Sequence, residues 1–311
     1  MHWIARLSTV RPDWRISGIF GFVPHRRRRA LSDAGCVPEN SQPSPLRVSV
    51  VIPAFNEQET IGRCIDALSA QSVPAFEVLV VDNMSTDHTV ARARSAAAAA
   101  GLPVRIVAQT DEQRLIPTRN RGLDEARGEV IARIDADTIV NAGWVHELTR
   151  IFESTTVAAT SGPVGYYDLP LTAVNRWIDN FARRVLTVVS GRDLFLFGCN
   201  MALRRSAWES IRSSACRDTD DLFHEDIDLA IHLRQHGLSI GYAPRLGATV
   251  SARSTGRTST EFADYTRRFE RTLDAHDMIR RPIRVAGALL RLAYPALHRA
   301  HRYEKRRALR T

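Results

Sequence analysis

Two aspartates close an apolar, strand-like stretch near the middle of the chain. In VIARIDADTIV, residues 130–140, Asp135 and Asp137 follow five residues typical of a buried strand, with one alanine between them. A third acid, Asp82, follows the similar run EVLVV. Carboxylate oxygens are the ligands that Mg²⁺ and Mn²⁺ prefer in proteins. The pattern therefore indicates a divalent cation site, although Asp-Ala-Asp-Thr could instead cap the turn before the next helix.

Strand and helix patterns alternate after Arg47 and predict how these acids are positioned. The β-branched runs VSVVI, EVLVV, VRIVA and VIARI are typical of strands buried on both faces. Helical patterns separate them, which implies a parallel sheet with helices on both faces. Ligands of such sheets bind beyond the carboxyl ends of the strands, where Asp82, Asp135 and Asp137 would meet. Because three carboxylates there repel one another, we expect a cation bound to diphosphate oxygens to offset them.

Local signals suggest where several helices begin and which face they bury. Asn56 with Glu59 has the spacing of a capping box, and Asn141 precedes the next periodic segment as a helix cap. We also expect a helix to begin near Glu225 and to end at Gly237.

The charge distribution divides the 311-residue chain into three parts. Residues 1–46 carry seven Arg against three acids, and residues 278–311 carry nine Arg and one Lys against one acid. With a formal net charge of +9, the middle part, 47–277, is left at −4. A nucleic-acid-binding domain would carry its basic surface on the fold itself, so no nucleic-acid partner is expected. Basic ends suit an anionic membrane surface, or are solvated tails.

Four ordered segments carry a resemblance to a known family. These are VVIPAFNEQETI, VVDNMSTDHT, TRNRGLDEARGEVIARIDADT and FHEDIDLAIHLRQHG. Together they resemble the family 2 glycosyltransferases of the GT-A fold, over roughly residues 48–253. The resemblance implies an α/β fold with a Rossmann-like, mostly parallel sheet flanked by helices and followed by a C-terminal helical extension. We expect residues 1–46 to be disordered or loosely attached, 47–277 to form the GT-A domain, and 278–311 to form a basic amphipathic helical segment.

The resemblance also implies which residues bind a nucleotide-diphosphate sugar. The loop after the first strand would wrap the base with Pro53, Ala54, Phe55 and Glu57. Asp82 would bind the base edge, although the family's usual Asp-Asp pair is Asp82-Asn83 here. Arg114 would support the base and phosphates, unless it is simply a surface arginine.

The same resemblance assigns the chemistry. Asp135 would contact the ribose, and Asp137 would hold Mg²⁺ or Mn²⁺. Asp226 would be the base that deprotonates an acceptor hydroxyl, which implies inversion at the anomeric carbon. Its neighbour Glu225 would support it or contact the acceptor, whereas acids in the first turn of a helix are also favoured by the helix dipole.

A further segment, FGCNMALRRSAW, resembles the acceptor side of the family's site. Gly198 would allow close approach of the sugar and Asn200 would hydrogen-bond it, although a tight turn entering a helix would look similar. We expect Trp208 in the core and Asp228 on the helix surface.

The chain departs from the family at two further places. The histidine that many relatives use as a further metal ligand is absent from GATVSARSTGRTS, where Arg253 or Arg257 could contact diphosphate instead. The Gln-x-x-Arg-Trp motif of processive members is also absent; YTRRF is the nearest match. Transfer of a single sugar is therefore expected.

These observations favour an inverting, metal-dependent, non-processive sugar transfer from a UDP- or GDP-linked donor, with a lipid-linked or cell-envelope glycan as a candidate acceptor. The alternatives are a catalytically weak, membrane-associated module that binds a nucleotide sugar and, less favoured, a sugar nucleotidyltransferase. The latter would favour a Gly-rich, basic loop, whereas PAFNEQET is acidic. Scattered cysteines and the lack of an 18-residue apolar run favour a cytoplasmic protein, peripheral at the inner face of the membrane if the basic ends bind lipid.

Overall fold

The computed structural model describes residues 45–277 except 170, 191–195, 219, 221 and 254–258. The predictions for the two basic ends, and for Arg257, therefore fall outside the described residues.

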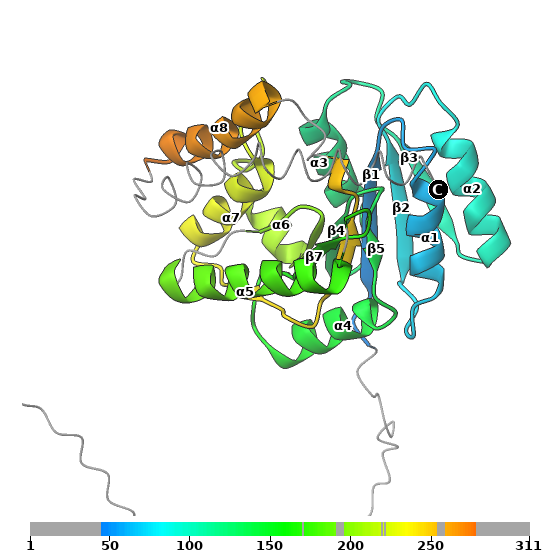
Figure 1. The fold of residues 1–311 in the computed structure, drawn as a ribbon, viewed down its shortest axis with the longest axis horizontal. Helices are drawn as coiled ribbons and strands as arrows, with labels where there is room; N and C mark the ends of the chain where they lie inside the picture. Colours follow the sequence, from blue (N-terminus) through cyan, green and yellow to red (C-terminus); the bar gives the residue numbers. More distant parts are fainter. Residues whose placement is uncertain are drawn as a thin grey trace, which may run out of the picture. The chain divides into compact units, whose positions relative to one another are not determined.

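A seven-stranded sheet in the order β3-β2-β1-β4-β8-β6-β9 forms the centre of the fold (Figure 1). Strands β1 (Val48–Ala54), β2 (Glu77–Asp82), β3 (Val104–Ala108) and β4 (Val130–Ile134) are mutually parallel, as the alternating pattern predicted. Strand β8 (Asn200–Arg204) runs antiparallel between β4 and β6 (Ala159–Ser161), and β9 (Ile240–Tyr242) is parallel to β6. The prediction of a mostly parallel sheet is confirmed.

A smaller sheet has three strands in the order β5-β10-β7, and its strand β5 follows the turn after β4. It contains β5 (Ile139–Val140), β10 (Ala248–Val250) and β7 (Val164–Tyr166). Because β5 begins two residues after Asp137, this sheet brings the chain around residue 250 close to the Asp-x-Asp turn.

Two apolar cores cover the two faces of the main sheet. Helices α1 (Ile61–Ser69), α2 (Thr89–Ala100) and α4 (Trp144–Ser154) contribute to one core. Helices α3 (Leu115–Glu125), α6 (Arg205–Ile211) and α7 (Glu225–Gln235) contribute to the other, across the sheet from α1 and α2 in Figure 1. Alternation along β1 divides its side chains accordingly: Val50 and Ile52 join the first core and Val51 the second.

Two predicted helix caps are wrong. Helix α1 begins at Ile61, and Asn56 instead adopts a left-handed conformation with φ of 54° in the preceding loop. There its side-chain oxygen accepts a hydrogen bond of 2.9 Å from the Thr86 amide and so ties the loop after β1 to the loop after β2. Helix α4 begins at Trp144, behind Gly143, and Asn141 contributes only its backbone oxygen. In both places contacts with another loop or with the backbone outweigh the local propensity for side-chain capping.

Two further helices lie beyond the sheet. Helix α5 (Thr172–Ser190) packs along β7, and α8 (Ser259–Ala275) packs against α7. None of the described helices has the length and apolar character needed to cross a bilayer.

Candidate active site

A cavity of about 630 Å³ opens beyond the carboxyl end of β4. Six of the residues predicted from the sequence line it: Asp135, Asp137, Gly198, Glu225, Asp226 and Arg253. The carboxylates expected to bind donor and to activate acceptor therefore open into one shared space. This volume lies within the usual range of roughly 300–1,000 Å³ for small-molecule sites.

The turn after β4 is closed without the aspartate side chains. The Thr138 amide donates to the Asp135 backbone oxygen at 2.9 Å, and the Thr138 hydroxyl accepts from the Asp135 amide at 3.2 Å. Asp135 instead accepts from Arg119 at 3.3 Å, and Asp137 accepts from Arg253 at 2.8 Å. The capping explanation for Asp-Ala-Asp-Thr is thus wrong, because backbone and threonine hydrogen bonds leave both carboxylates facing the cavity.

Asp137 is the more buried member of the pair. Its carboxyl is 9 % exposed, and burial together with the nearby charge of Asp135 raises its pKa, although Arg253 opposes the rise. Arg253 also binds Glu57 through hydrogen bonds of 2.8 and 2.9 Å. These two carboxylates hold the pKa of the half-exposed Arg253 guanidinium above its ordinary value, although its partial desolvation opposes the rise. Arg253 therefore neutralises part of the acid cluster in the protein described here.

Glu225 forms the centre of a buried ion-pair network. Its two carboxylate oxygens accept hydrogen bonds from Arg119 of α3 and Arg133 of β4. Burial raises the pKa of Glu225, but the two guanidinium groups lower it more, so the net shift is downward. With both oxygens engaged and only 2 % of its side chain exposed, Glu225 is a structural support of this wall, and the expected acceptor contact is not available to it.

Asp226 begins the same helix but faces the cavity. One of its oxygens accepts a hydrogen bond of 2.9 Å from the Gly198 amide, and the other accepts from the Ile227 amide at 3.0 Å. A Cβ at position 198 would lie only 2.2 Å from a guanidinium nitrogen of Arg133. A larger residue here would have to displace the Arg133 guanidinium, so close packing of Arg133 is one reason for a glycine at this position.

The prediction for Asn200 is wrong. The residue is fully buried in β8, where its side-chain oxygen accepts from the Trp144 indole at 2.9 Å. Its side-chain nitrogen donates to the backbone oxygens of Pro163 and Leu246 at 3.2 and 2.7 Å. All of these partners are structural, so Asn200 joins the two sheets and does not reach the cavity.

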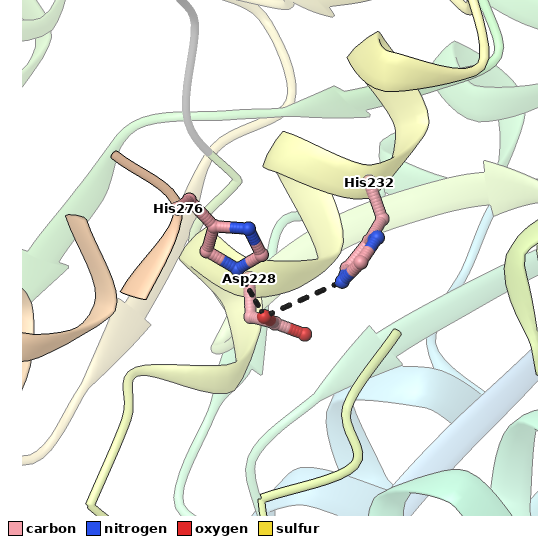
Figure 2. A group of neighbouring side chains, drawn as sticks. All are labelled: Asp228, His232 and His276. Carbon is pink, nitrogen blue, oxygen red and sulfur yellow. Dashed lines mark hydrogen bonds and ion pairs between the residues drawn. The ribbon is translucent and has the colours of Figure 1, made fainter. Parts of the chain in front are cut away.

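Asp228 is also misplaced by the sequence analysis, which expected it on the helix surface. Its side chain is 9 % exposed and accepts a hydrogen bond of 2.6 Å from the Cys216 amide. Its other oxygen lies near two imidazoles (Figure 2). Trp208, by contrast, is 2 % exposed, which confirms its predicted place in the core.

The predicted base- and phosphate-binding residues lie outside the lining of the cavity. They are Pro53, Ala54, Phe55, Glu57, Asp82 and Arg114. Ala54 pairs with Asp82 across the parallel strands β1 and β2, so the two loops expected to hold the base are adjacent. Arg114 forms an ion pair with Glu112 at the start of α3. Their contacts with a nucleotide stay predictions.

Sequence reasoning missed most of the cations around the acids. Arg119, Arg183, Arg253 and Arg268 all line the cavity, and only Arg253 was singled out beforehand. A signal was present for Arg133, because a charged residue in a strand buried on both faces requires a buried partner. That partner, Glu225, is 92 residues away along the chain and could not be read from the pattern.

Comparisons with known proteins decide the family. Residues 49–212, more than half of the chain, match the family model described as glycosyl transferase family 2. The chain belongs to this family. It is 34 % identical over 137 residues to the glycosyltransferase AglE of Haloferax volcanii, a match that covers 43 % of this chain and 44 % of AglE. It is also 34 % identical over 101 residues to the dodecaprenyl-phosphate galacturonate synthase of Rhizobium johnstonii, over 32 % of this chain and 30 % of that protein.

A solved structure supports the fold. The mannosyltransferase PcManGT from Pyrobaculum calidifontis, in complex with GDP-Man and Mn²⁺, superposes with a TM-score of 0.61 at 21 % sequence identity. The match covers 86 % of this chain and 76 % of PcManGT. The chain spans less than half the length of both sequence relatives, so the family is established, and the particular reaction is inferred below from the site itself.

Proposed function

We propose that this glycosyl transferase family 2 protein transfers a single sugar from a nucleotide-diphosphate sugar to an acceptor hydroxyl. The observation that carries the proposal is the shared cavity of Asp137 and Asp226. A donor held at one carboxylate and an acceptor activated at the other would meet in this space. The similarity to a mannosyltransferase solved with GDP-Man and Mn²⁺ supports a nucleotide-sugar donor.

The residues at the Asp-x-Asp turn fit a divalent cation. Asp135 and Asp137 offer hard oxygen ligands, and the raised pKa of Asp137 reflects a negative pair that is only partly offset. Asp137 would hold Mg²⁺ or Mn²⁺, and Asp135 would contact the ribose. When bound, such an ion supplies Lewis-acid stabilisation to the departing diphosphate oxygens. Arg253, whose guanidinium pairs with Asp137 and Glu57, would contact the diphosphate.

Asp226 would act as the general base. Its position at the first turn of α7 leaves it facing the cavity, while the Gly198 amide fixes one of its oxygens. The carboxylate would take the proton of the acceptor hydroxyl as that oxygen attacks the anomeric carbon, and one such displacement inverts the configuration there. General-base catalysis of this kind contributes about 10²–10⁴ in rate.

The side chains of helix α5 are evidence for an acceptor with both a polar and an apolar part. Two of its polar side chains face the protein. Asn175 accepts a hydrogen bond from the Tyr166 amide and donates one to the Tyr166 backbone oxygen, and Asp179 accepts from the Val164 amide at 2.9 Å. In the described part of the helix, large apolar side chains face outward, with Trp177 and Phe181 stacked at 5.7 Å and exposed by 64 % and 57 %. The exposed stripe also includes Val174 and Ile178 of α5 and Leu171, which directly precedes the helix.

This reversed amphipathic pattern is typical of a helix that lies on a bilayer. Because Arg183 of the same helix lines the cavity, an acceptor with a lipid anchor could lie along α5 while its polar end enters the site. The name of the dodecaprenyl-phosphate relative is consistent with a lipid-linked acceptor.

A non-catalytic, membrane-associated module that binds a nucleotide sugar is the second candidate. It is favoured by the ion pair between Asp137 and Arg253, which already neutralises the expected metal ligand. Both candidates would bind a nucleotide sugar, but only the transferase would turn it over.

Release of nucleoside diphosphate from a panel of UDP- and GDP-sugars, with Mn²⁺, with Mg²⁺ and with EDTA, distinguishes them. A donor that binds by calorimetry and is turned over only with metal supports transfer. Binding without turnover for every donor, with hydroxyl and lipid-linked acceptors present, would favour the module.

A further inference from the structure

Three potential metal ligands converge outside the cavity, between α7 and the end of α8 (Figure 2). Asp228 Oδ1 lies 2.7 Å from His276 Nε2 and 3.6 Å from His232 Nε2. The three ligand atoms all lie within 4.8 Å of one another. The two imidazole rings meet edge to face, with centroids 5.0 Å apart.

The positions of these side chains follow from the helices that carry them. Asp228 and His232 are four residues apart, so they lie one turn apart on the same face of α7. His276 directly follows α8 and reaches the same point from the other side. All three are largely withdrawn from solvent, with side-chain exposures of 9 %, 14 % and 12 %.

We propose that Asp228, His232 and His276 bind one divalent transition-metal ion of the zinc type. Two imidazoles and a carboxylate form a ligand set that zinc uses, whereas the all-oxygen Asp-x-Asp turn suits Mg²⁺ or Mn²⁺. The two sites therefore differ in the metal that they select.

The distances agree with such an ion. Ligand bonds of about 2.0–2.2 Å in a tetrahedral zinc site place neighbouring ligand atoms roughly 3.3–3.5 Å apart. The separation of 3.6 Å between Asp228 and His232 is already close to this value. The separation of 2.7 Å between Asp228 and His276 must widen by about half an ångström, which a small rotation of the terminal His276 ring provides.

The surroundings also orient one of the three ligands. The second oxygen of Asp228 accepts a hydrogen bond of 2.6 Å from the Cys216 amide. Outer contacts of this kind orient ligands in known sites.

An ion at this place would join the two helices that form one wall of the cavity. Asp226 lies two residues before Asp228 on α7, and α8 contributes Tyr265 and Arg268 to the lining. The ion would touch no reacting atom. Its effect is to fix α7 and α8 relative to each other and so to stabilise the folded chain.

Cobalt binding to the full chain, purified with chelator and then desalted, tests the proposal. We expect one equivalent of Co²⁺ to give the visible absorption of a low-symmetry, four-coordinate ion, and Zn²⁺ to displace it. Zn²⁺ at a hundredfold excess over Kd should raise the Tm by about 5–10 °C.

Variants then locate the site. His232→Ala and His276→Ala should each abolish the absorption. His236→Ala removes an exposed imidazole one turn away and should retain it, and Asp137→Asn, which removes the carboxylate of the other proposed site, should retain it too. If the variants fold poorly, the zinc content of the wild type after equimolar Zn²⁺ and desalting decides the matter. A wild type without bound zinc and with an unchanged Tm, or an absorption that persists in both histidine variants, overturns the proposal and leaves a plain Asp–His contact between helices.

Discussion

The two walls of the cavity are built in different ways. On the proposed donor wall, Asp135 and Asp137 follow β4 in a single turn, so three consecutive residues set their positions. The second wall combines lining residues from distant parts of the chain, namely Arg183 of α5, Asp226 of α7 and Arg268 of α8. The acids of the first wall also need distant partners, since Arg253 is 116 residues from Asp137. The positions of the two aspartates are thus set by neighbouring residues, whereas the cations that balance their charge are brought to them by the tertiary structure.

The largest effect is expected at Asp226, where the second wall performs the proposed chemistry. Asp226→Asn keeps the shape and can still accept from the Gly198 amide, but it cannot accept a proton. Turnover should fall by about 10²–10⁴ while the Kd of the donor stays within about twofold. Steady-state kinetics and calorimetry measure the two quantities. Wild-type turnover in the variant would remove Asp226 from its proposed role.

Glu225→Gln tests the buried ion pairs of Glu225 with Arg119 and Arg133. Removal of one partner from a buried ion pair leaves Arg119 and Arg133 uncompensated, which should cost about 3–5 kcal/mol in the free energy of unfolding. Glu209→Gln is the matched control, because the exposed pair of Glu209 and Arg205 should contribute only about 0–1 kcal/mol. Urea denaturation near pH 7 gives both values, and equal losses would contradict the network described here.

The same variant has a predictable pH dependence. The pKa of Glu225 is lowered in the folded state, so its stabilising contribution is present above the unfolded pKa of about 4.3. This contribution is lost as the pH falls through the lower folded value. The stability difference between wild type and Glu225→Gln should therefore shrink in acid. A difference that grows on acidification would reverse the assigned direction of the shift.

Asp137→Asn tests the donor wall. Loss of the charged ligand should weaken Mn²⁺ binding and lower kcat/KM on the order of 10²–10³, and EDTA should have a similar effect on the wild type. Asp66→Asn, on the exposed face of α1, is the control and should behave as wild type. Full activity of Asp137→Asn in EDTA would exclude a metal role for this residue.

Arg253→Ala tests whether the distant Arg253 competes with a metal ion for the carboxylate of Asp137. In the free protein Arg253 competes with a cation for Asp137. Its removal should strengthen Mn²⁺ binding in the absence of nucleotide by about tenfold, the equivalent of one charge-assisted contact. Calorimetry with Arg63→Ala as the control measures the change. Weaker Mn²⁺ binding would mean that Arg253 orients the carboxylate and does not compete for it.

The smallest effect on the fold is expected on α5. Changing both Trp177 and Phe181 to Ser should alter the free energy of unfolding by at most about 0.5 kcal/mol each, because both side chains are exposed. Binding to anionic phospholipid vesicles should fall at least about tenfold, since each ring loses apolar area that it would bury in lipid. Leu222→Ser, an exposed apolar residue outside the stripe, is the control in the same sedimentation assay. Unchanged vesicle binding of the double variant would show that α5 does not contribute to membrane binding.

Sequence alone determined the central features of this protein. Strands with β-branched residues, helices with one apolar face and acids at strand ends follow from periods of a few residues, so the mostly parallel sheet and the cavity positions of Asp135 and Asp137 could be predicted. The position of Asp226 was implied by the resemblance of its segment to a known family. Where a side chain had an alternative partner far along the chain, the prediction was wrong: Asn56 braces a loop, Asn200 joins two sheets, and Asp228 turns inward.

Only the tertiary structure decided which charges neutralise one another and which face of α5 is polar. Burial makes an unpaired charge or amide costly, so Glu225, Arg133 and Asn200 take their partners wherever the fold supplies them. Such partners are set by strand order and helix packing, and no short-range pattern encodes them.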